Sequence, residues 1–393
     1  MRNPFRAFFN KKIRLGSFII TCLVLVSAAV ALTYIWAVGG FGSAKYFEDA
    51  KKYIEIEKVL DENYIGDLDE DSLYEAAASG MVRALDDRWS YYMNEDDYQA
   101  YLLSQSNEYA GIGIGILTNA DGDFEISSIF EGSPAEEAGL QKGMLLLAID
   151  GEKVKGKSVT EVQTLIRSKL NSSLELTVKD LDGDEASFDV DCKPVYRSPV
   201  SSQMLDGNIG YIKIANFEAG SADEIITSLN YLMGEGAKGI IFDVRDNPGG
   251  LVSELCNALD AILPKGDLFV SVDKKGREKV TKSDKMSVKC DMVVLVNGNS
   301  YSAAEFFAAA LQEYNWASIM GQQTSGKARS QVTIELSDGS AIHLSTNKYL
   351  TPGRVDLAAA GGVTPDVVVE NVDNKTDSQL QAALDSFLES GED

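Results

Sequence analysis

The chain has 393 residues, 45% of them hydrophobic and 24% charged, which is enough apolar material for two to four domains. Its 60 acidic and 36 basic side chains give a net charge of −24, which argues against nucleic acid as a partner because phosphate binding needs clustered lysine and arginine. The single histidine, His343, excludes a multi-histidine metal centre, and the four cysteines show no CxxC spacing. We therefore expect neither a metal nor a cofactor.

The N-terminus differs from the rest of the chain in charge. Residues 1–14 hold five basic residues and no acidic one, and residues 15–44 hold no charge at all. This uncharged stretch is longer than the roughly 20 residues that span a bilayer as a helix. We expect a cytoplasmic segment at 1–14 and a single-pass membrane anchor at 15–40, with the remaining chain, of net charge −29, outside the cytoplasm. A cleaved signal peptide is the alternative, since Ala29-Val30-Ala31 has small residues at the cleavage spacing, but the apolar run continues past it to Val38.

Residues 45–108 are predicted to be helical. Apolar residues recur at helical spacing over 53–60 and 73–85, and Asp71 or Ser72 is a suitable first residue of a helix. We interpret this region as a packing element, and a homodimer formed through these helices remains open.

Residues 109–192 are predicted to form short strands separated by Asp-Gly turns, with one helix at 159–170. The order GSPAEEAGL at 132–140, KGM at 142–144 and IDGEKV at 149–154 resembles a PDZ domain, with Met144 where an aspartate is usual. The resemblance implies a groove that binds an extended peptide by strand addition. The turn Gly111-Ile112-Gly113-Ile114 would offer its N–H groups to a terminal carboxylate, although each glycine alone is equally typical of a turn or bulge.

Residues 193–370 alternate strands and helices, which indicates an α/β core, and residues 371–393 form a C-terminal helix and tail. Because open α/β folds place their sites at the carboxyl ends of the strands, chemistry is sought in three loops, 245–250, 297–302 and 321–327. The third nearly matches a phosphate-binding loop, but Ala328 replaces the Ser or Thr that holds magnesium, and a strand pattern follows instead of a helix. Asp67-x-Asp69-x-Asp71 likewise lacks the glycine and glutamate of a calcium loop.

Ser302 has two interpretations. Ser302-Ala303-Ala304-Glu305 precedes an apolar helix and matches a capping box, which has no catalytic meaning. A serine at a helix N-terminus is also well placed for oxyanion chemistry, because free N–H groups and the helix dipole face it. Lys327 can act as its base if burial lowers the lysine pKa from about 10.4, whereas an exposed loop lysine cannot.

Taken together, the three loops resemble those of the carboxyl-terminal processing peptidases, also called tail-specific proteases. The residues are FDVRDNPGGL at 242–251, SYSAAE at 300–305 and GKARSQ at 326–331; a helical prelude at 85–93 and late motifs at 348–354 and 362–366 also match. Departures stand at Tyr301, Ala304 and Ala328, and Tyr301 is expected to narrow the substrate channel or to shift the side-chain preference.

The resemblance implies a ClpP/crotonase-like core and a serine endopeptidase that cleaves exported proteins near apolar C-terminal tails. It implies Ser302 as nucleophile, Lys327 as general base and Gln331 as the group that holds the lysine amine. The oxyanion donors would be the N–H of Ala303 and that of Gly249 or Gly250. A PDZ domain that gates activity implies a latent state. Two alternatives remain, a catalytically inactive PDZ adaptor and a crotonase-like enzyme acting on a small acyl substrate, and a Cys256–Cys290 pairing stays open.

Overall fold

The computed structural model describes residues 15–40, 44–119, 121–284, 287–370 and 377–389, and the chain divides into two units, the first ending at Ala77 and the second beginning at Ala78. The first unit contains the helices α2 (Leu15–Gly40) and α3 (Ala44–Asn63) and the beginning of α4 (Glu70–Arg83). Within the described ranges, no helix is long and apolar enough to cross a membrane; the side chains of α2 are described for residues 19–35. The basic segment 1–14 lies outside the described residues.

Residues 45–108 contain helices α3, α4 and α5, as expected, together with strand β1 and the first residue of β2. Helix α5 (Glu95–Gln105) begins after Asn94, whose side chain accepts a hydrogen bond from the Asp97 N–H. The expectation was wrong at β1 (Tyr91–Met93), which pairs antiparallel with β17 (Ala341–Leu350). Three residues are too few for a periodic pattern, and this strand exists because a distant segment supplies its hydrogen-bond partners.

The PDZ region forms its own sheet, in the order β2-β8-β7-β5-β4-β3 with β6 beside β5. Its core contains Ile126, Leu146, Leu176 and Val162, all at most 2% exposed. Two helices complete it, α6 (Pro134–Glu137) and α7 (Val159–Arg167). The strands are β2 (Glu108–Gly111), β3 (Ile114–Thr118), β4 (Phe124–Ile129), β5 (Leu145–Ile149), β6 (Glu152–Lys153), β7 (Ser172–Lys179) and β8 (Glu185–Tyr196).

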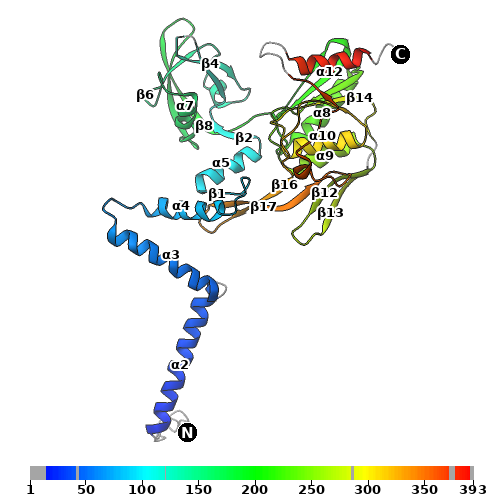
Figure 1. Ribbon diagram of the computed structural model, residues 1–393. Helices are drawn as coiled ribbons and strands as arrows, with labels where there is room; N and C mark the ends of the chain where they lie inside the picture. The colour runs from blue at the N-terminus through cyan, green and yellow to red at the C-terminus, as the bar shows by residue number, and fades with distance from the viewer. Residues whose placement is uncertain (1–14, 41–43, 120, 285–286, 371–376, 390–393) are drawn as a thin grey trace, which may run out of the picture. The chain divides into compact units, whose positions relative to one another are not determined.

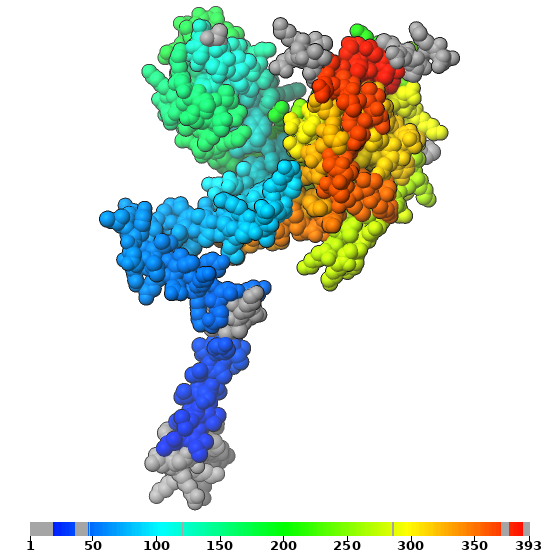
Figure 2. Space-filling model, viewed as in Figure 1, coloured from blue at the N-terminus to red at the C-terminus, as the bar shows by residue number. Residues whose placement is uncertain are grey.

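The α/β core is built on a six-stranded sheet in the order β18-β15-β14-β11-β10-β9, parallel except for β9. Side chains alternate between its two faces, as the pleat requires. Phe242 and Val294 pack against α8, α9 and α10, whereas Ile241 and Val293 pack against α12, which is red in Figures 1 and 2. Both faces are therefore covered, which explains the continuous apolar strands. The elements are β9 (Val200–Leu205), β10 (Ile209–Ile214), α8 (Ser221–Gly234), β11 (Gly239–Asp243), α9 (Val252–Ile262), β14 (Asp291–Val296), α10 (Ala303–Glu313), β15 (Ser318–Gly321), β18 (Val367–Val368) and α12 (Ser378–Glu389).

A third sheet connects the helical prelude to the lysine loop. Strands β1, β17, β12 (Gly266–Val272) and β13 (Glu278–Ser283) lie in this order, and β16 (Arg329–Glu335) also pairs with β17. Because β1 and β16 both run antiparallel to β17, the segment before β1 and the loop before β16 lie at the same end of the sheet. His343 lies in β17 opposite Tyr91, as a strand residue. Two short helices complete the chain, the 3₁₀ helix η1 (Asp206–Asn208) and α11 (Leu357–Ala360).

Candidate active site

Ser302 occupies a constrained position between β14 and α10. It is the N-cap of α10 and has φ 51° and ψ −117°, a conformation that costs free energy for a residue with a side chain and recurs at functional sites. Its N–H donates to Glu305 Oε2 at 2.9 Å, and the Glu305 N–H donates to the Ser302 carbonyl at 2.9 Å. The glutamate half of the predicted capping box is therefore present.

Glu305 does more than cap its helix. Its carboxylate is 0% exposed and accepts hydrogen bonds from the loop that precedes β16 as well as from Ser302. The donors in that loop are Thr324 Oγ1 (2.6 Å), Ser325 Oγ (3.2 Å), Gly326 N (2.7 Å) and Lys327 N (2.8 Å). A single buried carboxylate thus fixes the backbone at Ser302 and at Lys327 together.

The loop after β11, residues 245–250, is joined to the Ser302 loop by Asn247, which is fully buried. Its Nδ2 donates to the Ile214 carbonyl at 2.9 Å, and its carbonyl accepts from the Tyr301 N–H at 2.9 Å. Asp246 adds a second connection, because its carboxylate accepts from the side-chain amides of Asn297 and Asn299, each at 3.0 Å. The loop after β11 is therefore held against the loop that carries Ser302.

The two glycines proposed as oxyanion donors are in different situations. A Cβ on Gly249 would lie 2.8 Å from Ser302 Cβ and 3.0 Å from Ala303 N, so only glycine allows this approach. The Gly249 N–H already donates to Asn247 Oδ1 at 2.8 Å. In the described part of the chain, neither the Gly250 N–H nor the Ala303 N–H has an acceptor. The geometry favours Gly250 over Gly249 as the second donor.

Lys327 lies against an aromatic ring. Its Nζ is 4.3 Å from the centroid of the Trp89 ring, and Arg88 stacks on the same ring at 4.1 Å. These residues line an open cavity with Pro248 and Tyr301, and the Tyr301 ring contacts the Trp89 ring edge-on at 6.2 Å. Burial, followed by the charge of Arg88, lowers the pKa of Lys327, although the Glu305 carboxylate opposes the shift. The environment of Lys327 thus favours the neutral amine that a general base requires.

The structure does not bring all predicted catalytic groups into contact. Among the described residues, no hydrogen bond joins Lys327 Nζ to Ser302 Oγ or to Gln331. The Gln331 amide lies in β16 and donates instead to the Arg329 carbonyl at 3.1 Å and to Ser345 Oγ at 3.2 Å.

Sequence reasoning missed three residues of this site. Trp89 and Arg88 belong to the prelude motif, but nothing in their spacing showed that they face Lys327. The capping-box pattern indicates only a helix cap for Glu305. A further signal was its place in an otherwise apolar helix, because a buried glutamate needs several hydrogen-bond donors. Tyr301, expected to narrow the channel, does line the cavity.

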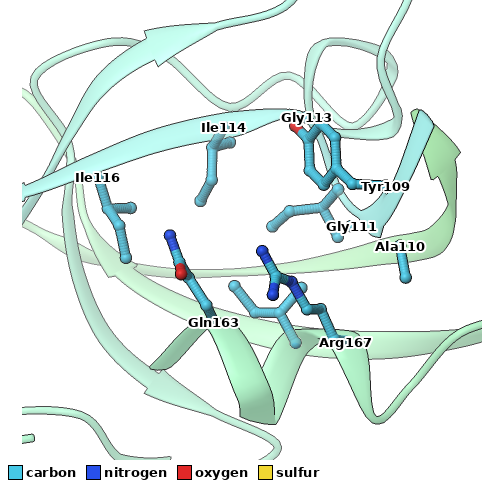
Figure 3. Close-up of a pocket in the computed structure, with 10 residues that line it drawn as sticks. Tyr109, Ala110, Gly111, Gly113, Ile114, Ile116, Gln163 and Arg167 are labelled. Atoms are coloured by element: carbon cyan, nitrogen blue, oxygen red, sulfur yellow. The ribbon is translucent and has the colours of Figure 1, made fainter. Parts of the chain in front are cut away.

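The PDZ groove lies between β3 and α7 (Figure 3). Ile114 and Ile116 line it from the strand, and Gln163 and Arg167 point into it from the helix. Gly113 has φ 81°, and a Cβ there would lie 2.1 Å from Ser133 Cβ, which explains the glycine. In the described chain the N–H groups of Ile112 and Gly113 have no acceptor, as expected of a loop that receives a carboxylate. Gly111, which ends β2, also lines the groove.

These features define an α/β hydrolytic enzyme with a peptide-binding domain, and comparison with known proteins agrees. Residues 208–369 match the model of peptidase family S41, residues 125–180 match a PDZ domain, and residues 40–97 match the N-terminal domain of the activating protease CtpB.

Two curated relatives and one solved structure specify the family. The carboxy-terminal processing protease CtpA of Bacillus subtilis (strain 168) is 35% identical over 79% of this chain and 66% of its own length. A probable CtpA-like serine protease of Staphylococcus aureus (strain COL) is 30% identical over 91% of this chain and 72% of its own length. The photosystem II D1 C-terminal processing protease matches with a TM-score of 0.50 and 25% identity, over 88% of this chain and 92% of its own. The chain belongs to the S41 family and is a carboxy-terminal processing serine protease.

Replacing Glu305 by Gln should inactivate the enzyme without unfolding it. The substitution replaces one carboxylate oxygen by an NH₂ group, which cannot accept the two or three hydrogen bonds that the oxygen accepted. The unpaired donors cost about 2–3 kcal/mol of local stability. We expect kcat to fall at least about a hundredfold and KM to change little. The control is Glu313→Gln at the far end of α10, which should leave kcat within about twofold. Steady-state kinetics and thermal unfolding measure both effects, and normal kcat in Glu305→Gln would refute the coupling of the two loops.

Proposed function

We propose that Ser302 is the nucleophile and Lys327 the general base of a serine endopeptidase. The observation that carries the proposal is the shared attachment of both backbones to the buried Glu305 carboxylate; Ser302 stands at a helix N-terminus and Lys327 is partly buried. A Ser-Lys pair needs no imidazole, which agrees with a chain whose one histidine lies in a strand.

In the proposed cycle, neutral Lys327 accepts the Ser302 hydroxyl proton as the oxygen attacks the scissile carbonyl. The N–H groups of Ala303 and Gly250 stabilise the tetrahedral oxyanion. Protonated Lys327 then donates to the leaving amine, and water releases the acyl group from Ser302. Before this can occur, the lysine amine must leave the Trp89 ring and approach Ser302, where Gln331 would orient it. We infer that the arrangement described above corresponds to a latent form; the support is the Lys327 amine lying on the Trp89 ring.

The proposed substrates are exported proteins with apolar C-terminal tails. The PDZ groove offers apolar side chains for the tail, free N–H groups at Ile112 and Gly113 for its carboxylate, and the Arg167 charge nearby. A tail bound there by strand addition would deliver the preceding segment to Ser302.

Removal of either catalytic side chain should abolish cleavage of an unstructured reporter that ends in an apolar tail. We expect Ser302→Ala and Lys327→Ala each to lower kcat/KM at least about a thousandfold, since the two groups act as one unit. The matched controls are the exposed residues Ser201 and Lys238, whose replacement by Ala should leave kcat/KM within about twofold. Cleavage that survives in either catalytic variant would refute the pair, and a chain without any activity that still binds the reporter would be an adaptor.

The free carboxylate of the tail should matter for capture and not for chemistry. Amidation of the reporter's C-terminus, or Arg167→Glu in the groove, should raise KM about tenfold and leave kcat nearly unchanged, because the lost interaction is made before the transition state. Steady-state kinetics with free and amidated reporters of the same sequence test this. Equal KM values for the two reporters would mean that the groove does not read the terminus.

We also propose that residues 15–40 anchor the enzyme, with residues 1–14 in the cytoplasm and the catalytic region outside. The support is the uncharged stretch of residues 15–44 and the five basic residues before it.

The anchor is tested by fractionating cells that express either the full chain or a chain that begins at residue 45. The full chain should remain with the membrane after alkaline extraction, and the shortened chain should not. A soluble full-length chain, or an intact mass showing cleavage near Ala31, would contradict the anchor and favour a signal peptide.

A further inference from the structure

The loop between β10 and α8 lies beside Gly249 and Gly250, which we call the oxyanion segment because one of them is the proposed second oxyanion donor. The Phe217 N–H donates to the Gly249 carbonyl, and the Leu251 N–H donates to the Phe217 carbonyl, both at 2.7 Å. A Cβ on Gly250 would lie 2.3 Å from the Phe217 carbonyl carbon and 2.8 Å from Glu218 N. The backbone at Glu218 is therefore packed directly on the segment that faces Ser302.

The same loop is held from its other side by two asparagines. The Glu218 N–H donates to Asn216 Oδ1 at 2.9 Å, and Asn216 Nδ2 donates to Asn107 Oδ1 at 2.8 Å. Asn107 Nδ2 donates in turn to the Ala219 carbonyl at 2.8 Å. The backbone at Glu218 and Ala219 is thus fixed in position.

The Glu218 side chain is unusual because one of its oxygens is buried without a partner. Within the described residues, Oε2 accepts no hydrogen bond. The charged and titratable groups around it are Lys327, Glu254 of α9 and Tyr101 of α5. Burial raises the pKa of Glu218 to about 7, and the Lys327 charge opposes this shift. An unsatisfied buried carboxylate is costly, and a group kept at such a cost near an active site is a candidate for function.

Charged and titratable groups from several elements interact electrostatically with Lys327. They are Glu305 of α10, Asp87 and Arg88 before β1, Glu218, and His343 of β17. Glu305 is committed to the two loops, and Asp87 accepts from Trp89 N and Ser90 Oγ. Glu218 is the acidic group in this set with an oxygen left free, so its charge can change without breaking the scaffold.

We propose that Glu218 is a positioning residue that sets the protonation state of Lys327. In the open site its carboxylate stabilises the ammonium form of Lys327 and so opposes the loss of the proton that burial and Arg88 favour. A bound substrate covers the site and excludes water, which favours neutral Glu218, and the amine of Lys327 then loses its proton more easily. This inference rests on the proposed role of Lys327 and explains how substrate binding would activate it.

The test measures Lys327 directly, in a Ser302→Ala background where no hydrolysis occurs. The full chain is treated with a small amine-reactive reagent over a range of pH, and the labelling rate of Lys327 is followed by peptide mass spectrometry. Glu218→Gln should lower the apparent pKa of Lys327 by about one unit, so that labelling below that pKa is about tenfold faster. Glu218→Asp retains the charge and should resemble the parent, as should the exposed control Glu235→Gln.

In the otherwise unaltered enzyme, the acid limb of kcat/KM should move to lower pH by the same amount in Glu218→Gln. An unchanged or raised Lys327 pKa in that variant, with normal thermal unfolding, would overturn the proposal. Because labelling does not depend on catalysis, that result is distinct from failure of the Ser-Lys assignment, which the cleavage assay reports.

Discussion

The rest of the site depends on the buried carboxylate of Glu305. Removing a carboxylate from water is expensive, and here the cost is offset by five donors and by the N-terminal end of α10, whose dipole favours a negative charge. Those donors come from Ser302 and from residues 324–327, so the proposed nucleophile and the proposed base cannot separate without leaving a buried charge unpaired. The Glu305 hydrogen bonds therefore hold the backbone rigid at Ser302 and Lys327, while the proposed mechanism requires the Lys327 side chain to move.

This rigid backbone would allow the proposed Ser-Lys pair to work without imidazole. A lysine becomes a base when its surroundings disfavour the ammonium ion; at Lys327 burial and the Arg88 charge do so, whereas the face of the Trp89 ring attracts the ammonium. His343 does not compete for the role. Its Nδ1 is hydrogen-bonded to Thr333 Oγ1 at 2.9 Å, and burial together with the Lys327 charge lowers its pKa to about 4. The one histidine is therefore a neutral strand residue at physiological pH.

The sequence predicted the PDZ region, the alternating core and the family, because strand alternation and loop motifs are local patterns. It also placed Ser302 at a helix start and Lys327 in a loop. The missed features all depend on contacts between distant segments. β1 exists through pairing with β17, and Trp89 reaches Lys327 through that same sheet. Glu218 lies beside Gly250 because its neighbour Phe217 forms a bridge to that glycine. The acidic surplus, by contrast, revealed nothing about the catalytic chemistry.

The central claim, that Ser302 attacks the substrate, is tested most directly by trapping the acyl-enzyme. The intact enzyme would be mixed with a peptide ester that ends in an apolar tail, quenched in acid within the first turnover, and digested for mass spectrometry. The account predicts that the acyl group is found on Ser302 and that Lys327→Ala prevents its formation. An acyl group on another residue, or product formed with no covalent intermediate, would contradict it.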